Sequence, residues 1–278
     1  MADAERPVEE LVTYEVTDSI ARITINAPDQ GNSLSWDMRD RIGDLLDEAS
    51  ASLAVRAVIL TGAGDRHFCT GANLGGPKRA EPERPEGAPE RSMGDAARLI
   101  KRGWQRLISC VLDCEKPVIG AINGTAAGGG AQLAIACDFV LMADNARFIE
   151  VFVRRGIMPD AGGAYLLPRL VGLHKAKELL MLGDDVPAEE AARIGIAMKV
   201  VPQSELQAEA RALAARLAAG PTKALTMTKW LVNRSFESSR QTAFEEEAYA
   251  QELVNTSADA AEGLAAFAQR RSPEFKGW

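Results

Sequence analysis

The chain has 278 residues, of which 46% are hydrophobic and 26% are charged, and its formal net charge is −7. This length and composition are typical of a globular protein with one large domain or two smaller ones. The negative charge argues against a nucleic-acid-binding protein, because such proteins gather Lys and Arg on one face. It leaves a local basic patch for phosphate groups open.

The cysteines, the histidines and the N-terminus argue against several other classes. The four cysteines show no disulfide framework, and neither His67 nor His174 completes a zinc-ligand spacing. We therefore expect free thiols in a reducing cytoplasm and no metal site. The first ten residues lack the basic and apolar regions of a signal peptide. Residues 117–137 are uncharged, but their five glycines favour a buried strand, loop and helix over a membrane span.

The first part of the chain alternates strand and helix patterns. Residues 1–10 are acidic and are expected to be loose. The stretches "IARITI" (20–25) and "RAVILT" (56–61) are predicted strands. Between them, apolar residues from Met38 to Ala49 recur at helical spacing.

The middle of the chain continues this alternation. The stretches "VIGAIN" (118–123) and "DFVLMA" (138–143) are predicted strands on either side of a glycine-rich loop and a short helix. Strands that alternate with helices predict an α/β fold. Residues 75–95 are rich in Pro, Gly and charge, which predicts a long mobile loop.

The last third of the chain is helical in pattern. Pro187 is placed to begin a helix and Gly195 to end it. From about residue 203 to residue 271 the pattern is almost wholly helical. The apolar faces of these helices need a partner, which is either the first part of the chain or another subunit.

The triple glycine in "GTAAGGGAQLAIACD" (124–138) fits no common nucleotide motif. A P-loop needs Lys and Ser or Thr after its last glycine, where this chain has Ala131 and Gln132. The stretch "GAGDRH" (62–67) lacks the third glycine of a dinucleotide fingerprint, and no G-x-S-x-G elbow occurs. His67 is interpreted as a turn or core residue rather than a base.

A backbone binding site remains. Glycines at a helix N-terminus let N–H groups approach a ligand oxygen closely, and two such groups from separate loops form an oxyanion hole. The loops "FCTGANL" (68–74) and "AAGGGAQ" (126–132) each follow a strand and are the candidates.

Five stretches together resemble the enoyl-CoA hydratase/isomerase family, the crotonase superfamily. The likeness runs in order from about residue 12 to the C-terminus. The stretches are "RITINAPDQGNSLS" (22–35), "VRAVILTGAGDRHFCTGANL" (55–74), "KPVIGAINGTAAGGGAQLAIACD" (116–138), "GIMPDAGGAYLLPRLVG" (156–172) and "EGLAAFAQRRSPEF" (262–275).

The resemblance implies a fold and an assembly. It implies a crotonase-like spiral of β-β-α repeats, placed at residues 11–202, followed by a helical trimerisation region at residues 203–278. Such trimers often pair into hexamers. The ligand would be an acyl-CoA thioester, with coenzyme A carried as part of the substrate and no separate cofactor.

The resemblance also implies the residues that bind the thioester. The N–H groups of Ala72 and Gly129 would hold its oxygen and stabilise an enolate-like anion. Further residues would line the substrate and CoA side, with the last two reaching CoA from the C-terminal region, in some members across a subunit boundary: Ser33, Leu34, Asn73, Leu74, Gly75, Gly128, Gln132, Phe152, Phe267 and Lys276.

This chain departs from the hydratases of the family at both acid–base positions. Those enzymes use two glutamates to activate water and to deliver a proton. The matching positions hold Gln132, which can orient water but cannot take its proton, and Phe152, which can do neither.

An aspartate stands elsewhere in the pattern. Asp160 lies four residues after Gly156, where isomerases of the family carry an aspartate, and its surroundings resemble the isomerases of phenylacetate degradation. Asp160 could then shuttle a proton as a single base, or it could be the N-cap of the following helix, and the two roles are compatible. Apolar neighbours such as Phe152 would raise its pKa, whereas a helix N-terminus would lower it.

Other charged residues are given structural roles. Glu150 is expected at the surface or in a subunit contact, Arg154 and Arg155 as solvated or paired charges, and Lys78 and Arg79 in a solvated loop. The leading hypothesis is an enoyl-CoA isomerase with Asp160 as base. The alternatives are a hydratase or lyase with atypical acid–base residues, and a non-catalytic acyl-CoA binder.

Overall fold

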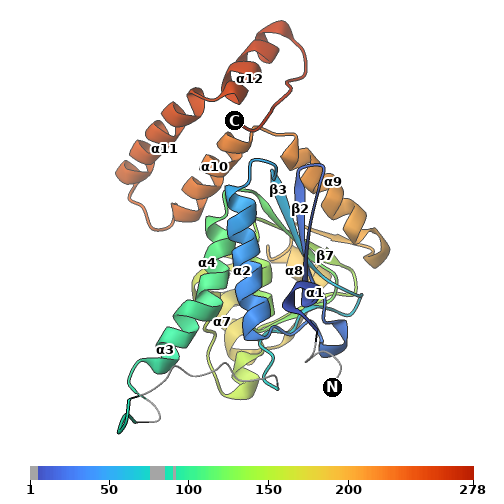
Figure 1. The fold of residues 1–278 in the computed structure, drawn as a ribbon, viewed down its shortest axis with the longest axis vertical. Helices are drawn as coiled ribbons and strands as arrows, with labels where there is room; N and C mark the ends of the chain where they lie inside the picture. The colour runs from blue at the N-terminus through green and yellow to red at the C-terminus, as the bar shows by residue number, and fades with distance from the viewer. Residues whose placement is uncertain (1–5, 76–84, 90–91) are drawn as a thin grey trace.

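A computed structural model describes residues 6–75, 85–89 and 92–278. The described chain forms two sheets, a body of helices around them and a helical extension at the C-terminal end (Figure 1). The predicted α/β fold is confirmed. The predicted loop 75–95 lies largely outside the described residues, which resume as turns before the helix that begins at Asp95.

The main sheet has six strands in the order β1-β2-β3-β5-β7-β10. β1 and β2 form an antiparallel hairpin, and every later neighbour is parallel. All residues of β3 and β5 are buried, as expected for central parallel strands that are covered on both faces. The strands span Val12–Thr17, Ile20–Ile25, Ala57–Gly62, Val118–Ile122, Phe139–Ala143 and Lys199–Val201.

The second sheet consists of four three-residue strands in the order β4-β6-β8-β9. They span His67–Cys69, Thr125–Ala127, Arg147–Ile149 and Asp185–Pro187. Each of the first three follows a strand of the main sheet, so the chain turns from one sheet to the other before the next helix. The sequence patterns miss these strands, because three residues are too few to show a period.

The helices of the main body surround the sheets. α9 packs on β2, β3, β5 and β7, while α2 packs against β1, β2 and α4. The α-helices of the main body are α1 Val8–Leu11, α2 Trp36–Ala51, α3 Asp95–Ile100, α4 Arg106–Asp113, α5 Gly129–Ala136, α6 Gly163–Val171, α7 Leu173–Leu182, α8 Ala188–Arg193 and α9 Leu206–Ala218. Short 3₁₀ segments at Pro28–Gln30, Val151–Arg155 and Gln203–Glu205, and a π segment at Lys101–Gln105, join them.

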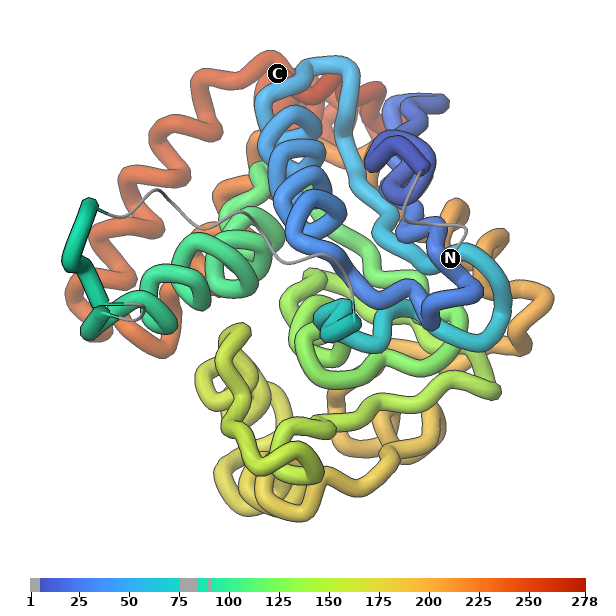
Figure 2. Tube along the Cα trace, turned by 60° about the horizontal axis from the view of Figure 1, so that its bottom comes forward, coloured from blue at the N-terminus to red at the C-terminus, as the bar shows by residue number. Residues whose placement is uncertain are grey.

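The C-terminal region is helical, as predicted. α10 (Thr222–Arg234) is tied to the body, because Lys229 Nζ lies 2.8 Å from the Asp138 carboxylate. α11 (Arg240–Asn255) and α12 (Ala258–Gln269) extend away from the sheets (Figure 1), and Figure 2 shows this extension on the side opposite α6 and α7. Among the described residues, no helix is long and apolar enough to cross a membrane.

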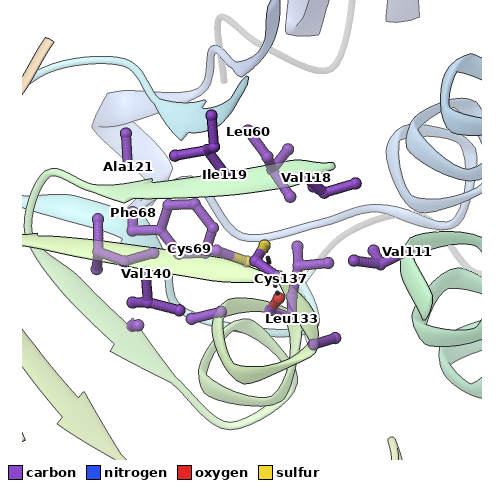
Figure 3. Packing of buried hydrophobic residues seen from close by; sticks show 14 of the residues in the cluster. Leu60, Phe68, Cys69, Val111, Val118, Ile119, Ala121, Leu133, Cys137 and Val140 are labelled. Atoms are coloured by element: carbon purple, nitrogen blue, oxygen red, sulfur yellow. Dashed lines mark hydrogen bonds between the residues drawn. The ribbon is translucent and has the colours of Figure 1, made fainter. Parts of the chain in front are cut away.

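One part of the core lies between the main sheet and α5. Figure 3 shows side chains of β5 above those of α5, with Phe68 between them. Every residue of α5 is buried, and Cys137 Sγ donates to the carbonyl of Leu133 at 3.5 Å. All four thiols are free, as expected. α5 is thus held on all sides before any ligand binds.

α5 approaches the second sheet too closely for a side chain at Gly130. A Cβ atom there would overlap the carbonyl oxygen of Cys69 at the end of β4 and lie 2.6 Å from its carbonyl carbon. Both contacts are backbone atoms, which cannot rotate away. Glycine at this position therefore fixes the distance between α5 and β4.

We expect Gly130→Ala to destabilise the protein by about 3 kcal/mol or more, because the helix must move off β4. Gly263→Ala is the matched control, since it also adds one methyl inside a helix, α12, but meets only Phe275 ring atoms at 3.4–3.6 Å. Chemical denaturation measures both. A Gly130→Ala protein as stable as Gly263→Ala would show that α5 has more freedom than this packing allows.

Candidate active site

The first predicted donor loop is the entry to α5. β6 ends at Ala127, Gly128 has φ 56° and ψ −123°, and the helix begins at Gly129. The first N–H groups of a helix have no partner within the helix, and they carry the positive end of its dipole. Gly128 N–H donates to Ile149 O at 3.0 Å, which ties the loop to β8. The Gly129 N–H is therefore a donor at the helix end, held by a backbone bond on its preceding residue.

The second predicted donor loop follows β4. Leu34 N–H donates to Gly71 O at 2.8 Å, and Asn73 N–H donates to Leu34 O at 2.9 Å. Leu34 and Ala72 form a parallel bridge. In this pattern Leu34 bonds to the neighbours of Ala72, so the N–H of Ala72 itself faces away from Leu34. A Cβ on Gly71 would lie 3.3 Å from the Gly129 nitrogen, so the two loops are in contact.

A broken helix covers the Gly129 side of this contact. α3 runs through the π segment Lys101–Gln105 into α4, with a non-helical backbone at Gly103 (φ −107°, ψ −105°). The break sets the half-buried indole of Trp104 over Gly129, where a Cβ would lie 2.6 Å from the ring. π segments within helices recur at functional sites. Trp104 is a wall of the site that the sequence patterns did not indicate.

Asp160 lies in a recess that is bordered by this broken helix at Ile100. The recess is lined by Ile100, Val153, Gly156, Ile157, Met158 and Asp160. Gln105 Nε2 donates to the backbone carbonyl of Asp160 at 3.3 Å, so one helix touches both the Gly129 loop and the Asp160 segment. Desolvation in this apolar recess raises the pKa of the Asp160 carboxyl above its ordinary value of 3.8.

The expected N-cap role of Asp160 is wrong. α6 begins at Gly163, its N-cap is Gly162 with φ 91°, and no side chain caps it. Asp160 stands two residues before this cap. Burial, which raises the pKa of Asp160, outweighs the hydrogen bond to its own backbone, which lowers it. The carboxyl is therefore available for a role other than capping.

The expected surface position of Glu150 is also wrong. Glu150 is 1% exposed, directly after β8, and Oε2 accepts a hydrogen bond from Gln132 Nε2 at 3.3 Å. Its Oε1 is buried and has no hydrogen-bond partner among the described residues. Desolvation raises the pKa of this carboxyl to about 7. The signal in the sequence was a lone acid within the apolar stretch from Phe148 to Val153, which the surface interpretation passed over.

Gln132 connects this buried carboxyl to the Asp160 segment. Its Oε1 accepts from the Ala161 N–H at 2.8 Å, while its Nε2 faces Glu150. Phe152 is 7% exposed and its ring lies about 4 Å from the position of a Cβ on Gly128. An amide and an aromatic ring thus border the first turn of α5.

Comparison with known proteins agrees with this architecture. Residues 15–278 match the family model described as enoyl-CoA hydratase/isomerase. The chain belongs to the enoyl-CoA hydratase/isomerase family. It is 36% identical over 266 residues to a probable enoyl-CoA hydratase of Rhodobacter capsulatus, covering 96% of this chain and 98% of that protein.

Two further members of the family are informative. The chain is 35% identical over 268 residues to the 1,2-epoxyphenylacetyl-CoA isomerase of Escherichia coli, covering 96% of this chain and 99% of that protein. A crystal structure of a putative enoyl-CoA hydratase from Streptomyces coelicolor superposes with a TM-score of 0.85 at 37% identity, covering 100% of this chain and 98% of that chain. The crotonase fold predicted from the sequence is confirmed.

Most residues that the family resemblance pointed to lie together in this member. The bridge between Leu34 and Ala72 and the contact between Gly71 and Gly129 bring the loop residues to one place. Asn73 and Ser33 flank the bridge, and Asn73 Nδ2 donates to Gln30 Oε1 at 3.0 Å. Leu74 and Gly75 are exposed at the edge of this loop, next to the segment that the structure does not describe.

The two C-terminal residues of the prediction lie elsewhere in the single chain. Phe267 is 86% exposed on α12, and the Lys276 N–H donates to Asp259 Oδ1 at 2.6 Å. Phe267 is part of α12, which lies in the helical extension in Figure 1, and Lys276 lies in the non-helical tail after it. Their proposed contact with CoA depends on a neighbouring subunit. Arg154 is paired with Asp185 at 2.8 Å, as expected of a surface charge, whereas Lys78 and Arg79 lie outside the described residues.

The raised pKa of Glu150 makes the stability of this family member pH-dependent. A folded-state pKa of about 7 against an ordinary value of 4.5 favours the protonated carboxyl in the folded protein. Its contribution to stability is therefore complete below pH 4.5 and is lost as the pH rises through 7. At about 1.4 kcal/mol for each pKa unit, the loss is about 3 kcal/mol.

We expect Glu150→Gln to remove this loss, so that the variant gains about 3 kcal/mol relative to the parent chain between pH 4.5 and pH 8.5. Urea denaturation at both pH values measures the gain. Glu189→Gln, on the exposed face of α8, is the control and should show no such pH-dependent difference. Equal pH dependence of the Glu150→Gln and parent proteins would contradict a buried, titrating Glu150.

Proposed function

We propose that this protein is an enoyl-CoA isomerase that moves a double bond in an acyl-CoA thioester with Asp160 as its base. The observation that carries the proposal is the position of Asp160. Its carboxyl lies in an apolar recess, and its segment is joined through Ala161 and Gln132 to the first turn of α5. The two glutamate positions of the hydratases hold Gln132 and Phe152, so Asp160 is the carboxyl left to exchange a proton with the substrate.

The proposed reaction uses one base and no redox step. The Ala72 and Gly129 N–H groups bind the thioester oxygen. The Asp160 carboxylate removes a proton from C2 of a 3-enoyl-CoA, and the electron pair forms a dienolate whose negative charge rests on the bound oxygen. Asp160 then returns the proton to C4, and the double bond moves from C3–C4 to C2–C3. Donors aimed at the developing oxyanion lower the barrier, and each raises the rate by a factor of about 10²–10³.

The proposal includes an oligomer, which we infer to be a homotrimer. α11 and α12 extend from the body, and large apolar side chains on them are exposed, namely Phe244, Tyr249, Leu253, Leu264 and Phe267. Exposed apolar side chains that gather on one element are typical of protein–protein interfaces. In a trimer, Phe267 and Lys276 would reach the CoA of an adjacent subunit.

Replacing Asp160 by Asn tests the proposed base. We expect the rate of double-bond migration on cis-3- or trans-3-enoyl-CoA to fall by about 10²–10⁴-fold, the usual contribution of a general base. In the parent chain, activity should decline as the pH falls through the raised pKa of Asp160, because only the ionised form accepts a proton. Absorbance of the conjugated 2-enoyl thioester measures both.

Asp184→Asn, an exposed carboxyl beyond α7, is the matched control and should leave turnover unchanged. Calorimetric binding of a saturated acyl-CoA and thermal unfolding should be the same for all three proteins. Full turnover by Asp160→Asn would refute the assignment. Loss of binding or folding together with turnover would assign Asp160 a structural role.

A hydratase is the second candidate, because the Rhodobacter capsulatus relative carries that name. Water addition would require a base at the site, and Gln132 and Phe152 cannot supply one. Crotonyl-CoA distinguishes the two, since hydration removes its conjugated absorbance and yields a product heavier by one water. We expect no such product.

A non-catalytic binder is the third candidate. A chain that binds acyl-CoA but converts no unsaturated substrate in a panel read by mass spectrometry would be such a binder.

A further inference from the structure

Glu150 is a buried carboxyl that the proposed reaction does not use. It directly follows β8, is 1% exposed, and contacts the first turn of α5 through Gln132. A carboxyl without a full set of partners is costly inside a protein. Its one side-chain hydrogen bond runs to Gln132, so the effect of Glu150 on the site passes through that residue.

The two ends of the Gln132 amide have opposite requirements. The Ala161 N–H needs an acceptor, which Oε1 supplies at 2.8 Å. Nε2 then points at Glu150 Oε2, which accepts at 3.3 Å. A flipped amide would place two donors against each other at Ala161, and an apolar residue at 150 would leave Nε2 unsatisfied. Glu150 and Ala161 together select one orientation of Gln132.

The amide is also confined sideways. A Cβ on Gly163, the first residue of α6, would lie 2.9 Å from Gln132 Cδ, so the side chain rests directly on this glycine. Gln132 is 0% exposed. Its side chain therefore links α5 to the Asp160–Ala161 peptide inside the protein, and the orientation of its amide decides where that peptide lies.

We propose that Glu150 is a positioning residue, whose carboxyl holds the Gln132 amide in the orientation that fixes the Asp160 segment beside the first turn of α5. This inference rests on the proposed role of Asp160 as base, and it adds the element that determines where the base lies. The nearby charges at this sheet edge are otherwise engaged. Arg147 and Arg154 both pair with Asp185, at 3.3 Å and 2.8 Å.

The protonation state of Glu150 matters for this role. An ionised carboxyl would accept from Nε2, but it would also place a negative charge near the anion that forms on the thioester oxygen. Burial opposes that charge and raises the pKa of Glu150 to about 7. A neutral carboxyl keeps the acceptor without the charge. A neutral amide at position 150 should therefore perform the same task.

Two substitutions of similar volume separate the acceptor from the charge. Glu150→Gln keeps an acceptor for Gln132 Nε2, and we expect kcat for double-bond migration within threefold of the parent value. Glu150→Leu removes the acceptor, and we expect kcat to fall at least tenfold with little change in KM. The parent chain should lose activity as the pH rises above 7 and Glu150→Gln should not. Glu189→Gln and Glu189→Leu on α8 are the controls, with unchanged kcat and pH profile.

A second readout needs no activity. The amide exchange rate of Ala161, measured by hydrogen exchange, reports its bond to Gln132 directly. We expect faster exchange in Glu150→Leu and parent-like exchange in Glu150→Gln and Asp160→Asn. Asp160→Asn keeps the hydrogen bonds of Gln132 to Ala161 and Glu150. Failure of the proposed base and failure of the proposed positioning therefore give different results. If Glu150→Leu does not fold, the pH profile of Glu150→Gln and its Ala161 exchange still decide.

Three outcomes would overturn the inference. They are parent-like kcat and Ala161 exchange in Glu150→Leu, a loss of kcat in Glu150→Gln as large as in Glu150→Leu, and an alkaline decline that persists in Glu150→Gln. Any of them would show that the site does not depend on an acceptor at position 150.

Discussion

The close packing of α5 on β4 is the constraint on which the site depends. α5 follows Gly128, begins with Gly129 and Gly130, carries no charge and is buried throughout. It can therefore approach a neighbouring backbone without a layer of side chains between them. That approach places the Gly129 donor beside the loop of Ala72. Rigid backbone donors need no reorganisation as charge develops, which is where their catalytic value lies. The core in Figure 3 therefore serves the site by fixing the start of α5.

The neutral residues around this turn follow from the same packing. A glutamate at position 132 would have to ionise between Gly163 and the Ala161 N–H, in a place without solvent. The amide that stands there satisfies two neighbours at once and carries no charge. The buried carboxyl of this region is instead Glu150, which is bonded to that amide, and Asp160 is the carboxyl of the recess. The electrostatics of the site thus consist of one partly exposed acid and one buried acid, with an amide between them.

The sequence was sufficient for four strands of the main sheet, β2, β3, β5 and β7, and for α2, α5, α8 and the helical C-terminal third, because each has a strong local signal of period or glycine. It did not indicate β1 and β10, or the helices α3, α4, α6 and α7. It was insufficient for β4, β6, β8 and β9, which are three residues long and exist through pairing with one another. The N-cap expectation for Asp160 failed because two glycines after it let the helix begin later. Glu150 was misplaced because an acid beside a short strand ordinarily faces water, and its burial depends on segments far away in the chain. Trp104 was missed because the break at Gly103 cannot be read from helical spacing.

Under the proposed function, the placement of Asp160 would allow one carboxyl to serve both halves of a double-bond shift. A base that is too weak cannot remove a C2 proton, and a conjugate acid that is too weak cannot return one to C4. A carboxyl with a raised pKa is a better base when ionised and is more readily protonated after the first step. Partial burial in the recess removes some of the water around the Asp160 carboxyl and so raises its pKa. The buried Phe152, which stands where the hydratases carry an acid, offers no group to bind a water for a competing addition. In the proposed reaction, proton return would thus depend on Asp160 and its recess, while Phe152 would disfavour hydration.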